Sequence, residues 1–308
     1  MSAAGQPASP QSDAADPGWT MLSPAESQPA QLSQLARSAW TVFRFEFGRS
    51  GTLKRSLIWL AVAAFPTLIF GMMRWTAGSL PGPAWTWLLF IMVVEMVVLL
   101  NALLWVAPLV QAELEGKTWL YVVTRPFGRY ALVLGKGMNG LAWTLGAGWC
   151  ALLGALLVSS LRATESVNTP HFGPGIAMTT GVTAPLQIGG VMLALTALSS
   201  LAYCSLFSAI GCMFPKRAML IAFSYTLVGE LLVGMMPAIV NRLTVQYHLR
   251  CLLTDWVGFE ISPEGRTFLF SEWSPTTHVL WIVCMAAIWQ AVALVTVHFR
   301  QYVVSDES

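Results

Sequence analysis

Long apolar stretches separated by short polar segments dominate this chain. A membrane-spanning helix needs about 20 predominantly apolar residues. Six stretches have this character: 56–73, 85–110, 137–161, 188–214, 218–240 and 278–299. None shows the strict alternation of barrel strands, and backbone groups in lipid must bond within helices or closed barrels. The pattern predicts an all-α integral membrane protein with six transmembrane helices between residues 56 and 300.

The composition agrees with a protein in a lipid bilayer. Hydrophobic residues make up 56% of the 308 residues and charged residues only 10%, whereas about 25% is usual for soluble domains. The net charge of +2 is too small to suggest a nucleic-acid partner. The five cysteines form neither a disulfide framework nor a CxxC metal pattern.

The polar N-terminal region divides into two parts. Residues 1–35 are rich in Ala, Pro, Ser and Gln and lack the features of a signal peptide, so we expect a disordered tail. Residues 36–55 carry apolar side chains at helical spacing, with arginines on the remaining surface. The apolar positions are Ala36, Trp40, Phe43 and Phe47. We expect an interfacial amphipathic helix here; the alternative is a simple extension of the first span.

Lys and Arg near the span ends predict the orientation. Placing the N-terminus in the cytoplasm leaves five of the 17 basic residues outside, namely Arg74, Arg162, Arg242, Arg250 and Arg266. The majority then lies inside, as the positive-inside rule requires. Both termini are therefore expected in the cytoplasm, including the tail 301–308. The loops 111–136 and 241–277 are expected to be cytoplasmic and external, respectively.

The loop 111–136 contains two fragments of a nucleotide-binding motif, but neither is complete. A phosphate-binding loop requires G-x-x-x-x-G-K-[ST]. For the Gly-Lys-Thr at 116–118 the first glycine position holds Gln111, and for the Gly-Lys at 135–136 it holds Tyr130. The residues therefore do not form an ATP site of this chain.

The same loop has the pattern of two helices joined by an elbow. Residues 112–124 can form a helix with Glu113 and Glu115 in its first turns, where the helix dipole favours acids. The dipeptide Arg125-Pro126 should end it, because proline removes a donor and restricts the residue before it. A basic turn from 129 to 136 then leads into the third span.

This loop resembles the permease subunits of ABC transporters of the type-two export class, in which the membrane subunit is a chain separate from the ATPase. The likeness rests on E-x-x-x-x-T, R-P-x-x-R and G-K: Glu113, Thr118, Arg125, Pro126, Arg129, Gly135 and Lys136. Many relatives place Gly directly before the Thr, where this chain has Lys117.

The resemblance implies a coupling helix that docks on an ABC ATPase subunit. ATP and magnesium would be bound by that partner, and this chain would bind no cofactor and catalyse no reaction. It further implies export through the bacterial inner membrane by a homodimer or a pair with a paralogous permease. The substrate is not indicated by any residue.

Two acids lie within predicted spans, Glu95 and Glu230. A charged group there is unfavourable by about 2.5–3.5 kcal/mol on insertion scales, so each should face protein or water. One interpretation is a lining of the translocation path or a polar contact between subunits. The other is a protonated carboxyl bonded to a neighbouring helix, for instance near Asn101.

Two alternatives to an ABC permease follow from the remaining polar residues. The first is a proton-coupled secondary transporter that uses Glu95 and Glu230. The second, less favoured, is a membrane-embedded enzyme with external acids, but these show no nucleophile and base at a recognisable spacing. They are Asp255, Glu260, Glu264 and Glu272. The external histidines His171, His248 and His278 are too scattered for a recognisable zinc site.

Overall fold

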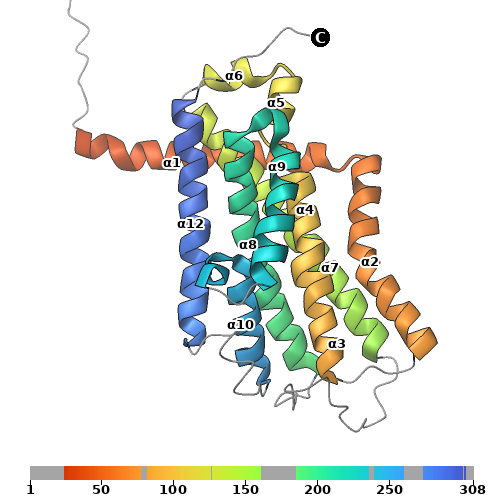
Figure 1. Ribbon diagram of the computed structural model, residues 1–308. Helices are drawn as coiled ribbons and strands as arrows, with labels where there is room; N and C mark the ends of the chain where they lie inside the picture. Colours follow the sequence, from red (N-terminus) through yellow and green to blue (C-terminus); the bar gives the residue numbers. More distant parts are fainter. Residues whose placement is uncertain are drawn as a thin grey trace, which may run out of the picture.

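The computed structural model describes residues 24–77, 82–125, 127–160, 185–235, 239–259, 273–300 and 302 (Figure 1). The elements in these ranges are helices, and none is a strand. The predicted all-α class is confirmed.

Five helices are long and apolar enough to cross a membrane. Their spanning parts are Leu53–Thr76, Ala84–Trp105, Gly128–Val158, Leu186–Met213 and Pro275–Phe299. The first belongs to α2 (Leu53–Ala77) and the third to α7 (Gly128–Ser160). The fourth belongs to α8 (Pro185–Met213), and the fifth is α12 (Pro275–Phe299). The second consists of α3 (Gly82–Leu89), the π-helix η1 (Phe90–Val97) and α4 (Val98–Trp105).

The predicted span 218–240 is not one regular helix. It is divided into α9 (Ala218–Tyr225), the π-helix η3 (Thr226–Leu232) and the 3₁₀ turn η4 (Val233–Met235). The 8 residues of α9 and the 7 of η3 end at this 3₁₀ turn, short of a spanning length, whereas the α and π pieces of the second span join into 22 residues. The described residues therefore contain five helices of spanning length, and the sequence predicted six.

The N-terminal helix α1 (Pro24–Ser50) lies across the end of the bundle (Figure 1). It begins before the predicted residue 36, so residues 24–35, which were expected to be disordered, are helical; residues 1–23 lie outside the described part. The backbone leaves the helix at 51–52, and α2 then runs along the bundle. The sequence 36–55 is therefore not a simple extension of the first span, because its helix ends at Ser50.

Helix α8 occupies the centre of the bundle. It packs against α7, α10 and α12. In an apolar stretch of 18 residues, 61% of the residues of α8 are buried, whereas the corresponding share is 17% in α2 and in α12. Tyr203 and Phe207 from α8 pack with Leu89 and Phe90 from α3 and η1 in one core. The outer helices α2 and α12 thus leave most of their apolar surface uncovered, as expected in lipid.

The predicted external loop 241–277 contributes to this core. After the 3₁₀ turn η5 (Ile239–Leu243), helix α10 (Val245–Val257) packs against α8 and α12. Leu249, Leu252 and Leu253 of α10 are fully buried. Residues 260–272 of the loop lie outside the described part.

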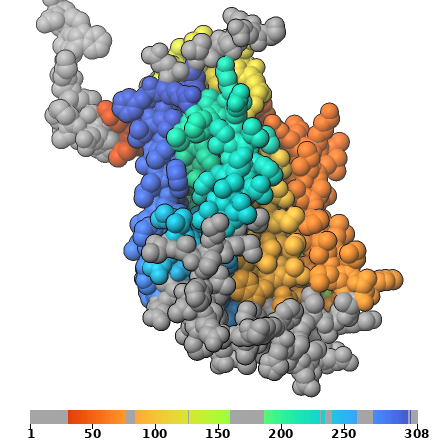
Figure 2. Space-filling view, in the orientation of Figure 1, coloured from red at the N-terminus to blue at the C-terminus, as the bar shows by residue number. Residues whose placement is uncertain are grey.

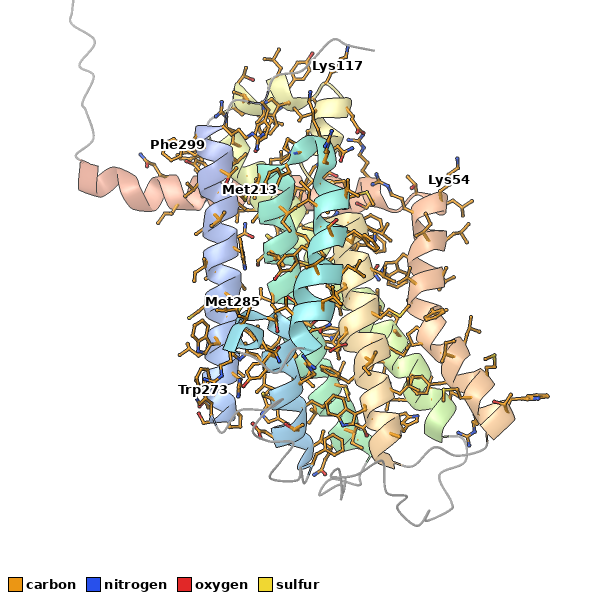
Figure 3. All side chains as sticks on the ribbon, in the orientation of Figure 1. Lys54, Lys117, Met213, Trp273, Met285 and Phe299 are labelled. Carbon is orange, nitrogen blue, oxygen red and sulfur yellow. The ribbon has the colours of Figure 1, made fainter. Side chains whose placement is uncertain are left out.

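The loop 111–136 lies at the opposite end, with α1. Lys54 and Lys117 mark this end of the molecule, and Trp273 marks the other (Figure 3). We call the end that carries α1, α5 and α6 the loop end. Helix α5 is Gln111–Glu115 and α6 is Trp119–Val123. The single helix predicted at 112–124 is wrong, because Lys117 has a φ of 53° and turns the chain between α5 and α6.

Candidate functional site

The turn between α5 and α6 places Thr118 over Glu113. The Thr118 hydroxyl donates a hydrogen bond to a Glu113 carboxylate oxygen, and the Thr118 amide donates to the Glu113 carbonyl at 3.1 Å. This geometry requires Lys117 in the left-handed region, which glycine adopts at least energetic cost. Lys117 therefore has a backbone conformation that is typical of glycine.

Lys136 joins this turn to two other helices. Its Nζ lies 2.5 Å from Glu113 Oε1 in α5 and 3.7 Å from Glu46 Oε1 in α1, while Lys136 itself belongs to α7. The three side chains are only 9–14% exposed. A buried cation between two carboxylates requires close geometry, since desolvation otherwise outweighs the attraction. We call Glu46, Glu113, Thr118 and Lys136 the loop-end network.

The charge state of Glu113 follows from its neighbours. Burial disfavours the ionised carboxylate, but the hydrogen bonds from Lys136 and Thr118 and the charges of Lys136 and Arg49 outweigh it. The pKa of Glu113 is therefore lowered from its ordinary value of 4.5. Glu113 is an anion at neutral pH, so the contact with Lys136 is an ion pair.

Helix α1 is held against α7 by close packing as well as by charge. The Asn139 side chain donates to the Ser50 hydroxyl at 3.0 Å, and the Ser50 hydroxyl donates to the Glu46 carbonyl at 2.5 Å. A Cβ placed on Gly135 would lie 2.7 Å from both the Ala39 carbonyl oxygen and Val42. Gly135 is thus needed for the close approach of the two helices.

A pocket of about 470 Å³ opens beside the loop-end network. Its polar wall contains Glu46, Glu113 and Lys136 together with Arg49 and Arg55. Trp105 forms part of the apolar wall, with Arg55 over its ring at 5.6 Å. Water in the pocket can therefore reach the edge of the network.

The remaining loop residues of the sequence motif lie elsewhere. Arg129 donates to the His298 carbonyl at 3.1 Å and so connects the start of α7 to the end of α12. Arg125 is exposed, and Pro126 lies outside the described residues. Glu113, Thr118 and Lys136 meet in one network, which Gly135 adjoins through α1, whereas Arg125 and Arg129 do not take part in it.

Sequence reasoning missed Glu46, Ser50 and Asn139 as members of this site. Glu46 lies between Arg44 and Arg49 in a predicted basic helix, and this isolated acid was the available signal. Ser50 and Asn139 gave none, because their pairing depends on how α1 crosses α7.

Helix α6 presents an apolar surface at the loop end. Leu120 is 69% exposed and Tyr121 is 73% exposed, whereas Trp119 beside them is buried against Tyr302 with ring centroids 4.7 Å apart. Two large uncovered side chains on a helix beyond the ends of the spans are suited to contact another protein.

Glu230 is hydrogen-bonded to neighbouring helices, as in the second of its two predicted interpretations. Its carboxylate oxygens accept from the hydroxyls of Tyr203 and Tyr225, each at 3.1 Å, and from the amides of Gln246 at 3.1 Å and Val245 at 3.5 Å. Those amides belong to the first two residues of α10, and they have no partner within the helix. Glu230 therefore caps a buried helix.

Glu95 is only partly buried, and Arg250 lies close enough for their charges to interact. Asn101, the suggested neighbour, instead donates to the Val97 carbonyl of its own helix at 3.0 Å. The structure thus brings a basic residue from the predicted external loop towards the acid in the second span.

Two histidines that looked scattered in the sequence form a pair. Nδ1 of His248 lies 2.8 Å from Nδ1 of His278, and Nε2 of His248 lies 2.9 Å from the Arg242 carbonyl oxygen. His248 therefore donates from Nε2 and accepts from His278 at Nδ1. Within the described ranges, no group of three His, Cys, Asp or Glu could hold a metal ion.

No protein-family model and no curated protein matches this chain. The resemblance of the 111–136 segment therefore rests on its own residues.

Proposed function

We propose that this chain is the permease subunit of an ATP-driven ABC exporter and that the loop 111–136 receives the motion of a separate ATPase. The observation that carries the proposal is Lys136, which joins Glu113 of the loop to Glu46 of α1 from within the spanning helix α7. A displacement of α5 would thereby act on two membrane-associated helices at once.

The exposed side chains of α6 support the binding of a separate protein at the loop end. Leu120 and Tyr121 would contact the ATPase, while the loop-end network behind them would transmit the movement. Coupling of this kind requires that the partner bind differently to two states of the permease. Residues for docking and residues for transmission are therefore distinct and can be changed separately.

The proposal includes the finer topology expected from the sequence. The pieces α9, η3 and η4 form the sixth crossing, both termini and the loop end face the cytoplasm, and α1 lies in the interface of the bacterial inner membrane. Two permease subunits, identical or paralogous, work with two ATPase subunits, which bind ATP and magnesium.

Co-purification tests the proposal. The tagged protein is isolated from its native membrane in mild detergent, and co-eluting chains are searched for a complete Walker A loop. We expect such a chain with the wild type and its loss in Leu120→Glu/Tyr121→Glu. The control is Leu53→Glu, which changes a 78% exposed leucine at the start of α2.

A second variant separates docking from transmission. Lys136→Met should retain the ATPase chain, because Lys136 is buried, but lose the dependence of ATP hydrolysis on the permease. If no Walker A chain co-elutes under conditions that keep other membrane complexes intact, the proposal fails. The proton-coupled alternative would then rest on Glu95, since Glu230 is bound by four donors.

A further inference from the structure

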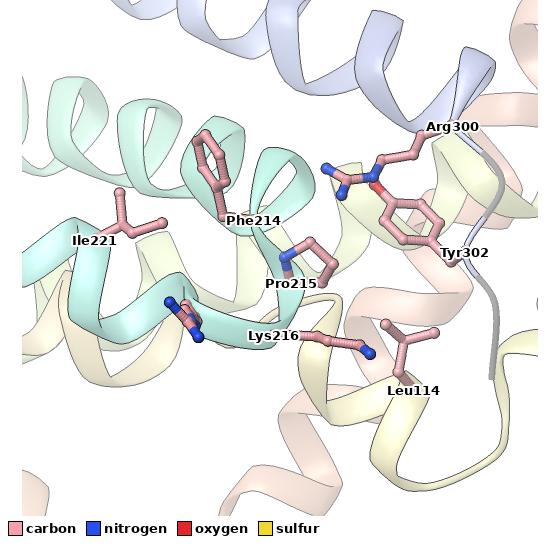
Figure 4. A pocket seen from close by; sticks show the side chains of 8 residues that line it. Leu114, Phe214, Pro215, Lys216, Ile221, Arg300 and Tyr302 are labelled. Carbon is pink, nitrogen blue, oxygen red and sulfur yellow. The ribbon is translucent and has the colours of Figure 1, made fainter. Parts of the chain in front are cut away.

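A second pocket at the loop end combines positive charge with an apolar rim. It has a volume of about 310 Å³ and lies where the turn between α8 and α9 meets the end of α12 and helix α5 (Figure 4). The 3₁₀ turn η2 (Pro215–Arg217) forms one side. Lining side chains are Leu114, Phe214, Pro215, Lys216, Arg217, Ile221, Arg300 and Tyr302.

No carboxylate lies among the described residues that line this pocket. Lys216, Arg217 and Arg300 line it together. Lys136 forms ion pairs with Glu113 and Glu46, and neither of these carboxylates lines the pocket. Three cations around one hollow favour an anion, since charges of the same sign raise the local potential.

Arg300 is held in position by the protein. Its guanidinium donates to the Met213 carbonyl and lies 5.6 Å from the centre of the Tyr302 ring. The Tyr302 hydroxyl in turn donates to the Cys212 carbonyl at 2.7 Å. The chain after α12 is thus fastened to the end of α8, which fixes one cation of the pocket before any ligand arrives.

Uncovered apolar side chains continue from the pocket along α9. Phe214 on the pocket wall is 44% exposed, and Leu220 and Phe223 are 63% and 52% exposed. The side chains of α9 form part of the face seen in Figure 2. A ligand with an anionic group and long hydrocarbon chains matches both surfaces, whereas a free anion or an acidic peptide matches only the first.

We propose that this pocket binds the headgroup of an anionic phospholipid in the leaflet at the loop end. The phosphate contacts Lys216, Arg217 and Arg300, and the acyl chains lie along α9 over Leu220 and Phe223. Basic pockets between membrane helices on the cytoplasmic side are suited to such headgroups. Because Leu114 of α5 also lines the pocket, a bound lipid would contact the loop 111–136 directly. The inference does not depend on the proposed ATPase partner.

The experiment measures lipid retained by the purified protein. The full chain is reconstituted in nanodiscs of phosphatidylcholine with increasing phosphatidylglycerol, released into detergent, and examined by native mass spectrometry. The test variant is Lys216→Gln/Arg217→Gln, since both side chains are exposed. The matched control is Lys54→Gln/Arg125→Gln, which removes the same charge from exposed positions at the same end.

We expect one tightly bound phosphatidylglycerol in the wild type and the control. The test variant should bind it roughly 30-fold more weakly, because each basic residue near an anionic lipid contributes about a factor of five. Lys216→Arg/Arg217→Lys, which exchanges the two cations, should restore binding.

Three results would overturn the proposal. Equal loss in the test and control variants would indicate general surface charge. Unchanged binding in the test variant would exclude this pocket. Displacement of the lipid by millimolar inorganic phosphate, without any effect of acyl chains, would indicate a site for free anions. The thermal unfolding temperature of the test variant is measured as well. If it is lower than that of the wild type, the exchange variant Lys216→Arg/Arg217→Lys is used instead, and loss of phosphatidylglycerol from this folded variant would also overturn the proposal.

Discussion

Replacing Lys136 by Met removes the cation of the loop-end network while keeping a side chain of similar length. Lys136 Nζ lies 2.5 Å from Glu113 and 3.7 Å from Glu46. With an effective dielectric constant of about 20, these distances correspond to attractions of about 7 and about 4 kcal/mol before desolvation is subtracted. The net effect is smaller, because burial of all three groups opposes the attraction.

In Lys136→Met, stability should be lost mainly because the carboxylates of Glu46 and Glu113 no longer face a cation. Removing one partner of a buried pair costs about 3–5 kcal/mol, and the adjoining pocket lets water reach Glu46 and Glu113. We therefore expect Lys136→Met to lower the free energy of unfolding by about 3 kcal/mol. The double variant Lys136→Met/Glu113→Gln should lose only about 1 kcal/mol, since a neutral amide still accepts from Thr118 and leaves no buried anion in α5.

Unfolding of the purified protein by sodium dodecyl sulfate in mixed micelles, followed by tryptophan fluorescence, measures both values. The double variant is the decisive comparison. If it is as unstable as Lys136→Met, the damage comes from lost packing in α7 and the ion pair with Glu113 does not stabilise the loop.

Three further predictions concern neighbouring contacts. Gly135→Ala should move α1 away from α7, because its Cβ would meet the backbone carbonyl of Ala39 at 2.7 Å. Disulfide formation between cysteines placed on α1 and α7 should then become slower. An unchanged rate of disulfide formation would contradict the close packing of the two helices. The lowered pKa of Glu113 means that its ionised form stabilises the fold above its ordinary value of 4.5 and that this contribution is lost as the pH falls below it. The stability difference between wild type and Glu113→Gln should therefore shrink on acidification, and a difference independent of pH would refute the ionic role. Glu230→Gln replaces one acceptor at the start of α10 by a donor, so the free energy of unfolding should fall by about 1–3 kcal/mol. Maleimide should then label the buried Cys251 of α10 faster than in the wild type. Equal labelling rates would show that Glu230 does not cap α10.

The motif residues of the loop 111–136 were recognisable in the sequence, but the sequence did not show which of them contact one another. Glu113, Thr118 and Lys136 were expected as part of one motif, and the structure brings them together. Arg129 belongs to the same motif, yet it contacts the end of α12. Spacing along the chain cannot distinguish these cases, because both depend on which helix passes beside the start of α7.

The surroundings of Glu95 and Glu230 could not be predicted from the sequence either. Because Glu95 and Glu230 each interrupt an apolar run, the sequence left two interpretations open: a translocation path or subunit contact, and a carboxyl bonded to a neighbouring helix. The return of α10 into the bundle supplies two amides to Glu230, and Tyr203 of α8 and Tyr225 of α9 supply the hydroxyls. The sequence placed α10 in an external loop, since its mixture of Arg, His and Asp lowers the hydropathy of the segment below that of a span.

The sequence by itself determined the helical membrane class, the approximate positions of five spanning helices and the presence of a charged loop between the second and third. These features follow from local hydrophobicity, because each apolar stretch must satisfy its backbone bonds within one helix. The tertiary structure decided which charges meet: Glu46 with Lys136, Arg250 near Glu95, His248 with His278, and the three cations of the second pocket. Those contacts join residues far apart in the chain, and their distances depend on how helices cross and where π and 3₁₀ segments change the winding, which no local pattern specifies.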